Sequence, residues 1–315
     1  MPKLAALTGA TGFIGRHVVT ALRRRGWDVR VLARRHPAEL LSPYHRFELV
    51  LGDLGDMPAL ERLVSGADAI IHLGGLVKAL SRDDFYSANE AGTQRLLRAA
   101  ARTAPDAMLV HVSSLAAREP QLSPYCDSKH RAEQKVQALA GDRIWTILRP
   151  PAVYGPHDRE ILPLFKAAKL GLVPYPAAPH AALSMIHVAD LADAIVACLS
   201  RSGSPQAIFE VDDGVPGGYR WPDILGAVGE AVGHKPAGIR LPRTGLKLAA
   251  EVNRLRSRID RTPRILAPHK VAEIYWPDWV VRGDRLQDVS DWQPAFDVWS
   301  GFRDAAKWYR SAHLL

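Results

Sequence analysis

The stretch TGATGFIG, residues 8–15, decides the fold of this chain. It follows the apolar run KLAALTG and opens the helical pattern FIGRHVVTALRRRG, so that Gly9, Gly12 and Gly15 recur every third residue. The first glycine permits a tight strand-to-helix turn, the second lets the backbone approach a pyrophosphate, and the third lets the helix pack closely. The N–H groups at the helix start then face the phosphates. The stretch therefore predicts a dinucleotide-binding turn.

The segments that follow alternate between strand and helix patterns. Short apolar runs occur in DVRVLA, FELVLGD, DAIIHLGG and MLVHVSS, and later in RIWTILRPP and SMIHVADLADAIVACL, with helical patterns between them. Such alternation predicts an α/β fold in which helices cover both faces of a doubly wound parallel sheet, the Rossmann fold. We expect residues 1–155 and 183–212 to form this NAD(P)-binding domain. Residues 156–182 and 213–315 lack the alternation and predict a smaller, C-terminal substrate-binding lobe.

Composition indicates a soluble globular protein. The chain has 315 residues, of which 47% are apolar, enough for a large core. No apolar run reaches the roughly 18 to 20 residues that cross a bilayer, and the first residues enter a strand pattern without a signal peptide. We therefore expect a cytoplasmic protein without a transmembrane segment. Its two cysteines, Cys126 and Cys198, are too few for a disulfide framework.

The end of the second predicted strand indicates which dinucleotide binds. NAD-specific sites usually have an acidic residue here for the ribose 2′-hydroxyl, whereas this chain has Arg34 and Arg35 in VRVLARRHP. Two guanidinium groups suit a 2′-phosphate, because each can bind phosphate oxygens through parallel N–H groups. The sequence therefore favours NADP(H) over NAD(H). If both arginines are only exposed loop residues, the preference stays open.

The segment SPYCDSK places Tyr125 four residues before Lys129. On a helix both side chains lie on one face. Such pairs are common on solvated helices, so the spacing alone does not establish a function.

The order of motifs resembles the extended short-chain dehydrogenases/reductases of the epimerase/dehydratase type. The resemblance covers residues 3–212 and is fainter toward the C-terminus. It rests on motifs that occur in the order expected for that family: TGATGFIG, GDLGD, HLGG, NEAGT, VSS, YCDSK, LRPPAVYGP and IHVADLADAI.

The resemblance implies three catalytic residues. Tyr125 would be the general acid/base, Lys129 would bind the nicotinamide ribose and lower the tyrosine pKa, and Ser114 would hydrogen-bond the substrate oxygen. A free phenol has a pKa near 10, which a neighbouring ammonium lowers. Asn89 would either position the active-site helix or a water, or have only a structural role.

The resemblance also implies a set of cofactor contacts. Asp53 would contact the adenine, and the other residues would line the dinucleotide along the carboxyl ends of the strands. Together with Lys129, the predicted cofactor-binding residues are Gly9, Gly12, Phe13, Ile14, Gly15, Arg34, Arg35, Asp53, Leu54, Leu73, Gly74, Gly75, Pro150 and Val153.

The sequence lacks the motifs of two other kinds of catalytic site. The histidines show no metal-ligand spacing such as His-Glu-xx-His, so we predict no metal site. A serine hydrolase of the G-x-S-x-G type would need a motif that is absent.

Two departures from the family pattern bear on the substrate. Only ten residues separate Ser114 from Tyr125, and LAAREP follows the serine where nucleotide-sugar members often have Tyr-Gly. RPPAVYGP and the apolar GLVPYPAAP look more like the reductase and hydroxysteroid-dehydrogenase-like branches. We interpret Lys78, after the fourth strand, as a surface residue, although some sugar-nucleotide members have substrate contacts there.

The net charge of +8 is concentrated in one segment. Residues 235–270 contain ten Lys or Arg against Glu251 and Asp260. Within it, Leu248, Val252, Leu255 and Ile259 recur at helical spacing, which we interpret as a helix packed on the core. The basic residues leave four further options open: a phosphate-bearing substrate, an acidic carrier protein, a membrane surface and nucleic acid.

We therefore predict an NADP(H)-dependent oxidoreductase that moves a hydride between nicotinamide and a carbonyl/alcohol substrate. The alternative is a nucleotide-sugar epimerase or dehydratase without net redox, and a third option is a non-enzymatic nucleotide sensor or nucleic-acid binder. The intact Ser114, Tyr125 and Lys129 argue against the third, and we expect no nucleic-acid partner. The resemblance also implies a homodimer through the helices GTQRLLRAAA and YCDSKHRAEQKV.

Overall fold

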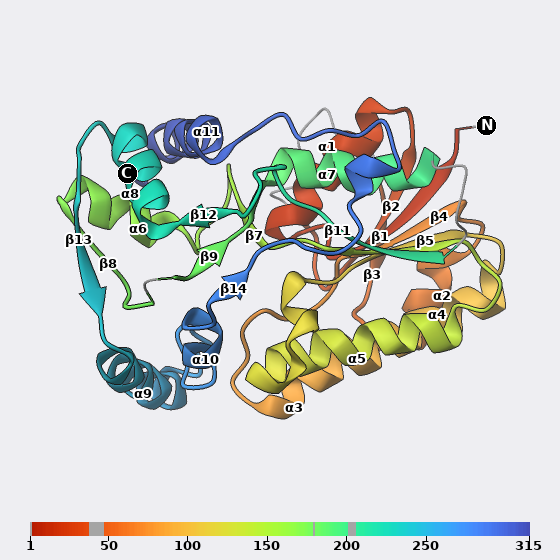
Figure 1. Cartoon of the computed structure of the whole chain (residues 1–315). Helices are drawn as coiled ribbons and strands as arrows, with labels where there is room; N and C mark the ends of the chain where they lie inside the picture. Colours follow the sequence, from red (N-terminus) through yellow and green to blue (C-terminus); the bar gives the residue numbers. More distant parts are fainter. Residues whose placement is uncertain (1, 38–46, 179, 201–205) are drawn as a thin grey trace.

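A seven-stranded parallel sheet forms the centre of the protein (Figure 1). The computed structural model describes residues 2–37, 47–178, 180–200 and 206–315. The sheet order is β11-β6-β5-β4-β1-β2-β3, which confirms the predicted Rossmann fold. The strands are β1 (Leu4–Thr8), β2 (Asp28–Ala33), β3 (Glu48–Leu51), β4 (Ala69–His72), β5 (Met108–Val112), β6 (Trp145–Arg149) and β11 (Gln206–Glu210).

Helices cover both faces of this sheet. One face packs against α1 (Phe13–Arg24) and α7 (Val188–Ala197). The other packs against α2 (Met57–Val64), α4 (Gly92–Thr103) and α5 (Pro124–Leu139). Figure 1 shows the two layers above and below the sheet. The four central strands β1, β4, β5 and β6 are buried along almost their whole length, which explains why they read as apolar runs, whereas the edge strand β3 is exposed at both ends.

A third apolar cluster lies outside the sheet. It collects side chains from α6 (Leu162–Lys169), α8 (Trp221–Val232) and α11 (Val298–Ser311). Small sheets surround it: β7 (Ala152–Tyr154) with β10 (Met185–His187), β8 (Leu172–Pro176) with β13 (Ala237–Leu241), and β9 (Ala182–Leu183) with β12 (Tyr219–Arg220) and β14 (Asp278–Trp279). This separate core supports the predicted division into two units, which stays a prediction.

Three further helices border the start of α5. They are α3 (Arg82–Phe85), which runs into a π-helical segment Tyr86–Ala91, together with α9 (Arg243–Asp260) and α10 (Lys270–Ile274). No helix in the described residues has both the length and the apolar character of a membrane span.

The apolar stripe of α9 corrects one prediction. Leu248, Val252, Leu255 and Ile259 are exposed rather than packed on the core, and Ala250 is the residue of this helix that is buried. The stripe therefore faces away from the protein.

Candidate active site

The carboxyl ends of the strands meet at one edge of the sheet. Thr8 of β1 is in register with His72 of β4, and His72 with His111 of β5. Residues that follow these strands therefore emerge side by side. The segments predicted to bind the cofactor and the substrate follow β1, β2, β3, β4, β5 and β6, so this shared edge brings them together.

The glycine-rich turn has the predicted shape. Gly9 has a φ of +74°, and a Cβ there would lie 2.8 Å from the carbonyl carbon of Leu73. A Cβ on Gly15 would lie 2.1 Å from the Gly9 carbonyl oxygen, so only glycine lets α1 sit this close to the turn. Gly12 is the N-cap of α1, and no side chain among the described residues caps the helix. The first N–H groups of α1 are thus open to an anion, as a bound pyrophosphate requires.

The predicted nucleotide-specificity residues lie at the ends of β2 and β3. Arg34 and Arg35 are exposed directly after β2, and Asp53 is exposed after β3, where its Oδ1 accepts a hydrogen bond from the Gly55 N–H at 2.7 Å. The Gly52 N–H donates to the Ala33 carbonyl, which joins the two strand ends. Neither guanidinium is bonded to another residue in the described ranges. Both are therefore available to a ligand.

The remaining predicted cofactor residues lie along the same edge. The Gly74 N–H donates to Thr8 Oγ1 at 3.0 Å, and Leu54 packs against Gly74. The Pro150 carbonyl accepts a hydrogen bond from the Leu115 N–H at 2.8 Å. The other members of the set are partly buried or exposed in α1, after β4 or in β7: Phe13, Ile14, Leu73, Gly75 and Val153.

Ser114, Tyr125 and Lys129 come together at the carboxyl end of β5. Ser114 follows β5, while Tyr125 and Lys129 lie on successive turns of α5. Ser114 lies near enough to the Tyr125 hydroxyl to lower its pKa. Lys129 is buried, and its Nζ donates to the Val112 carbonyl at 2.9 Å. The three side chains that the sequence analysis singled out therefore share one site.

Burial controls the protonation of this site. It raises the pKa of Tyr125 above its usual value, the Ser114 hydrogen bond acts in the opposite direction, and Glu273 raises it further. Burial lowers the pKa of Lys129 to about 8, against an upward effect of Glu133. The Tyr125 shift is opposite to the one expected from a neighbouring ammonium, because burial is the larger effect. The phenol therefore stays protonated at neutral pH.

Asn89 connects the loop after β4 to α5. Its Oδ1 accepts from the Leu76 N–H at 2.7 Å, and its Nδ2 donates to the Leu76 carbonyl at 3.0 Å and to Ser128 Oγ at 2.9 Å. Ser128 directly precedes Lys129. Asn89 lies in the π-helical segment, a distortion frequently found at functional sites. Its contacts fix the position of the helix that carries Tyr125 and Lys129.

His72 is part of the same framework. Its Nδ1 lies 2.7 Å from Thr8 Oγ1 and its Nε2 lies 2.9 Å from Thr93 Oγ1. Thr93 donates its own proton to the Asn89 carbonyl, so Nε2 must be the donating nitrogen. Burial lowers the pKa of His72 to about 3. No group of three or more His, Cys, Asp or Glu side chains that could hold a metal forms in the described part of the chain.

The sequence analysis missed the C-terminal residues around Tyr125. The Nζ of Lys270 on α10 lies 5.1 Å from the centre of the Tyr125 ring and pairs with Glu273. Arg118, in the turn after Ser114, donates to the carbonyls of Asp278 and Val280 at 2.8 and 2.9 Å. No spacing motif links residues so far apart along the chain, so only the folded structure reveals these contacts.

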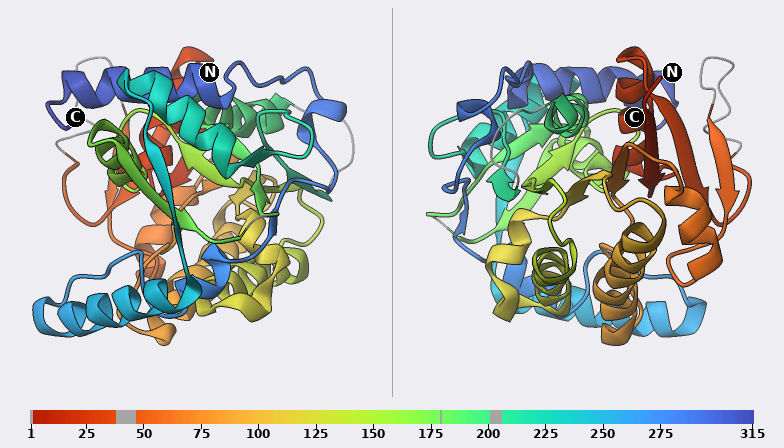
Figure 2. Two further views of the ribbon diagram at one scale, coloured as in Figure 1. Left: turned by 60° about the vertical axis from the view of Figure 1, so that its left-hand side comes forward. Right: turned by 90° about the vertical axis from the view of Figure 1, so that its right-hand side faces the viewer.

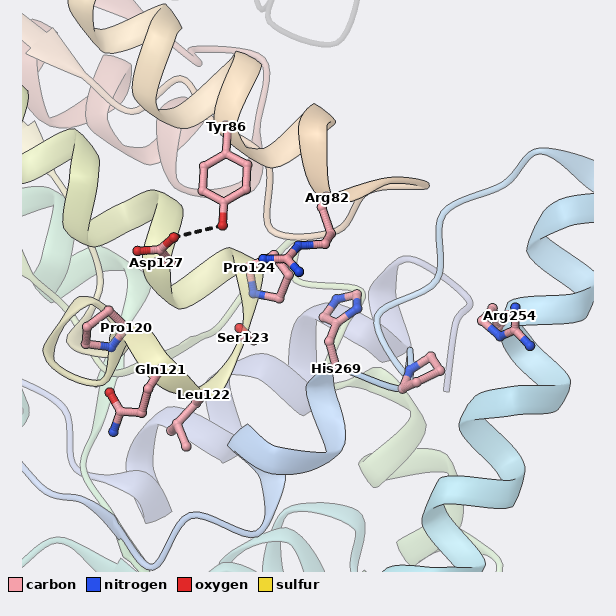
Figure 3. Close-up of a pocket in the computed structure, with 11 residues that line it drawn as sticks. Arg82, Tyr86, Pro120, Gln121, Leu122, Ser123, Pro124, Asp127, Arg254 and His269 are labelled. Atoms are coloured by element: carbon pink, nitrogen blue, oxygen red, sulfur yellow. Dashed lines mark hydrogen bonds between the residues drawn. The ribbon is translucent and has the colours of Figure 1, made fainter.

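A pocket of about 650 Å³ lies beside the start of α5 (Figure 3). Ser123, Pro124 and Asp127 line it from α5 and its N-cap, and His269 and Arg254 from the C-terminal part. Tyr125 does not line the pocket. Phe85 contacts both Tyr125 and the pocket residue His269, because its ring centre lies 6.1 Å from that of Tyr125 and 5.7 Å from that of His269.

Comparison with known proteins identifies the family. The model of the NAD dependent epimerase/dehydratase family matches residues 5–211. The chain belongs to this family. It is therefore an NAD(P)-dependent dehydrogenase, reductase, epimerase or dehydratase of the extended short-chain dehydrogenase/reductase type.

Among its relatives is the ceramide reductase of Caulobacter vibrioides. The two are 38% identical over 313 residues, which is 99% of this chain and 96% of the relative. A ketoreductase of Stigmatella aurantiaca that acts on a farnesyl dihydroquinoline oxide is 30% identical over 229 residues, covering 67% of this chain and 68% of the relative.

Solved structures with the same fold include two that bind uridine nucleotides. One is MoeE5 in complex with UDP-glucuronic acid and NAD, with a TM-score of 0.75 and 22% identity over 98% of this chain and 99% of that one. The other is UDP-glucose 4-epimerase from Bifidobacterium longum with NAD⁺ and UDP, with a TM-score of 0.76 and 17% identity over 99% of both chains. At these identities the likeness concerns the fold alone.

Proposed function

We propose that this protein is an NADP(H)-dependent reductase that converts a substrate carbonyl to an alcohol at Ser114, Tyr125 and Lys129. The observation that carries the proposal is the convergence of these side chains at the carboxyl end of β5: Ser114 follows β5 and acts on the Tyr125 hydroxyl, and Lys129, one helical turn after Tyr125, donates to the Val112 carbonyl. This group lies at the same sheet edge as the glycine-rich turn. A proton donor and a dinucleotide turn at one edge are what a carbonyl reductase needs.

Each of the three residues has a distinct role in this proposal. When bound, the nicotinamide supplies a hydride to the substrate carbon. Tyr125 donates its proton to the substrate oxygen, and Ser114 holds that oxygen by a hydrogen bond. The raised pKa of Tyr125 keeps the proton on the phenol at neutral pH, which suits the reductive direction. The Lys129 ammonium holds the nicotinamide ribose.

The preference for NADP(H) is part of the proposal. It rests on the exposed Arg34 and Arg35 directly after β2, because residues 34–37, the part of this loop that the structure describes, contain no carboxylate for a ribose 2′-hydroxyl. Gly9, Gly12 and Gly15 would shape the pyrophosphate turn, and Asp53 would contact the adenine.

We further propose a weakly polar lipid substrate of the ceramide class. The full-length similarity to the ceramide reductase supports this, as does the loop after β4. That loop exposes Leu76, Val77 and Leu80 and is joined to the smaller unit by the Lys78–Glu160 ion pair of 2.6 Å. An apolar loop at the boundary of the two units suits an acyl chain better than a sugar diphosphate.

The test distinguishes a reductase, which consumes NADPH, from an epimerase or dehydratase, which returns the hydride to its own substrate and keeps its dinucleotide bound. Purified protein is denatured, released nucleotide is identified by mass spectrometry, and NADPH oxidation is followed with an oxidised ceramide bearing a ketone. Little bound nucleotide with substrate-dependent NADPH oxidation is the expected result. Stoichiometric bound NAD(P), with conversion of a UDP-sugar and no net oxidation, would instead establish the epimerase or dehydratase alternative.

The cytoplasmic location and the homodimer also belong to the proposal. The two helices that would form the dimer, α4 and α5, pack side by side on one face of the sheet. Light scattering coupled to gel filtration checks the dimer, since a monomer mass would contradict it.

A further inference from the structure

Helix α9 exposes a stripe of large apolar side chains. Leu248, Val252, Leu255 and Ile259 have exposed fractions of 69%, 41%, 52% and 85%. Their spacing of four, three and four residues places them on one face at about 100° per residue. Single exposed apolar residues are ordinary, but a continuous stripe along a helix marks an interaction surface.

The opposite face of α9 is the one that contacts the protein. Ala250 is fully buried there, the Asn253 side chain donates to the Leu266 carbonyl at 3.2 Å, and Ser257 accepts a hydrogen bond from Arg264 at 3.1 Å. The helix is therefore held in place by its polar and small residues. Its apolar stripe makes up the exposed face of the helix.

Basic residues flank the stripe on both sides. At about 100° per residue, Lys247 and Arg258 lie along one border and Arg256 along the other. All three are exposed. In the described ranges none of them forms an ion pair, whereas Arg254 pairs with Glu251 and Arg264 with Asp260. The border of the stripe therefore carries uncompensated positive charge.

We propose that α9 docks onto an anionic bilayer surface. An interfacial helix buries an apolar face at the boundary between headgroups and acyl chains, and its Lys and Arg side chains reach outward to the phosphates. Anionic headgroups complement the charge that flanks the stripe. A second copy of the chain would oppose like charges, and a nucleic acid would leave the apolar stripe in water.

The place of α9 in the molecule agrees with this mode of binding. It runs along the lower edge of the protein in all three views, outside the layers of the Rossmann sheet (Figures 1 and 2). Arg254 of the same helix lines the pocket beside Ser123 and Pro124 at the start of α5 (Figure 3). Docking through α9 would bring that pocket close to the bilayer.

The experiment is co-sedimentation of the full chain with vesicles. One set contains phosphatidylcholine with about one third phosphatidylglycerol, and the other contains phosphatidylcholine alone. The stripe variant is Leu255→Glu with Ile259→Glu. Its matched control is Leu170→Glu with Val289→Glu, because these residues lie outside α9 and are similarly exposed, at 86% and 54%. The charge variant is Arg256→Ala with Arg258→Ala, and its control is Lys166→Ala with Lys169→Ala on exposed positions of α6.

We expect the wild type and both controls to bind anionic vesicles, and salt to weaken that binding. The stripe variant should bind at least about tenfold more weakly, and the charge variant should lose most of its preference for anionic over neutral vesicles. All four variants should bind NADPH as tightly as the wild type. This binding checks that the variants are folded and does not depend on enzymatic activity.

Three results would overturn the proposal. The first is a wild type that stays in the supernatant with both vesicle types, and the second is a stripe variant that binds like its control. The third is a stripe variant that changes the oligomeric mass without changing vesicle binding, which would assign the stripe to a second copy of the chain.

Discussion

Ser123 at the start of α5 donates a hydrogen bond from its Oγ to Oε1 of Glu273 on α10, at 2.6 Å. Both side chains are buried. The other carboxylate oxygen of Glu273 pairs with Lys270, which lies over the Tyr125 ring. The C-terminal part of the chain thus binds the N-cap residue of α5, which lies two residues before Tyr125.

Ser123→Ala should lower the free energy of unfolding by roughly 2 to 3 kcal/mol, because it removes both a helix cap and a partner of a buried carboxylate. Ser123 Oγ also accepts from the Cys126 N–H at 3.1 Å. The matched control is Ser81→Ala, which removes an exposed cap of α3 only and should cost about 1 kcal/mol. Urea unfolding measures both. Equal losses would show that the Glu273 contact contributes nothing.

Tyr125→Phe should reduce turnover by about 100- to 10,000-fold while changing the Kd for NADPH by less than about twofold, because only the proton donor is lost. The control is Tyr86→Phe. The Tyr86 hydroxyl donates to Asp127 at 2.8 Å, outside the proposed reaction centre. Single-turnover kinetics and fluorescence titration give the two quantities. Wild-type turnover in the Tyr125 variant would rule out the proposed mechanism.

Replacing Arg34 and Arg35 together by alanine should raise the Kd for NADPH by about 10- to 100-fold, because two charge-assisted contacts to the 2′-phosphate are lost. The Kd for NADH should change little. Arg24→Ala, at an exposed arginine paired with Asp193, serves as the control. A parallel loss of affinity for both dinucleotides would contradict the assignment of these arginines to the 2′-phosphate.

Gly12→Ala and Gly15→Ala should fail in different ways. A Cβ on Gly12 would meet only the Gly9 carbonyl oxygen at 3.2 Å, whereas on Gly15 it would lie 2.1 Å from that oxygen. We expect the first to cost less than about 1 kcal/mol of stability but to weaken NADPH binding at least tenfold. The second should cost more than about 3 kcal/mol. Thermal unfolding with cofactor titration separates these effects, and a stable Gly15→Ala protein would disprove the close packing of α1.

The rate of reduction should fall as the pH rises through about 8. Burial lowers the pKa of Lys129 to about 8, so its ammonium is present below that pH and lost above it. We expect kcat/KM to decrease by about tenfold per pH unit on the alkaline side. In Lys129→Arg the charge persists, so any remaining activity should lack this descending limb. A wild-type profile that stays flat to pH 10 would exclude a role for the charge of Lys129.

Local chemistry made much of the fold predictable. The positive φ of Gly9 and the alternation of apolar runs with helical patterns are properties of short segments, so the sequence by itself determined the order of strands and helices and the dinucleotide turn. The positions of Tyr125 and Lys129 on one face of a helix followed from helical spacing in the same way.

Tertiary structure decided what depends on neighbours from distant parts of the chain. Burial, and not the adjacent lysine, sets the direction of the Tyr125 pKa, and Glu273 reaches Ser123 across 150 residues. The pattern of Leu248, Val252, Leu255 and Ile259 established that α9 has an apolar face. It could not tell whether the protein covers that face, because periodicity describes one helix and exposure depends on what packs against it.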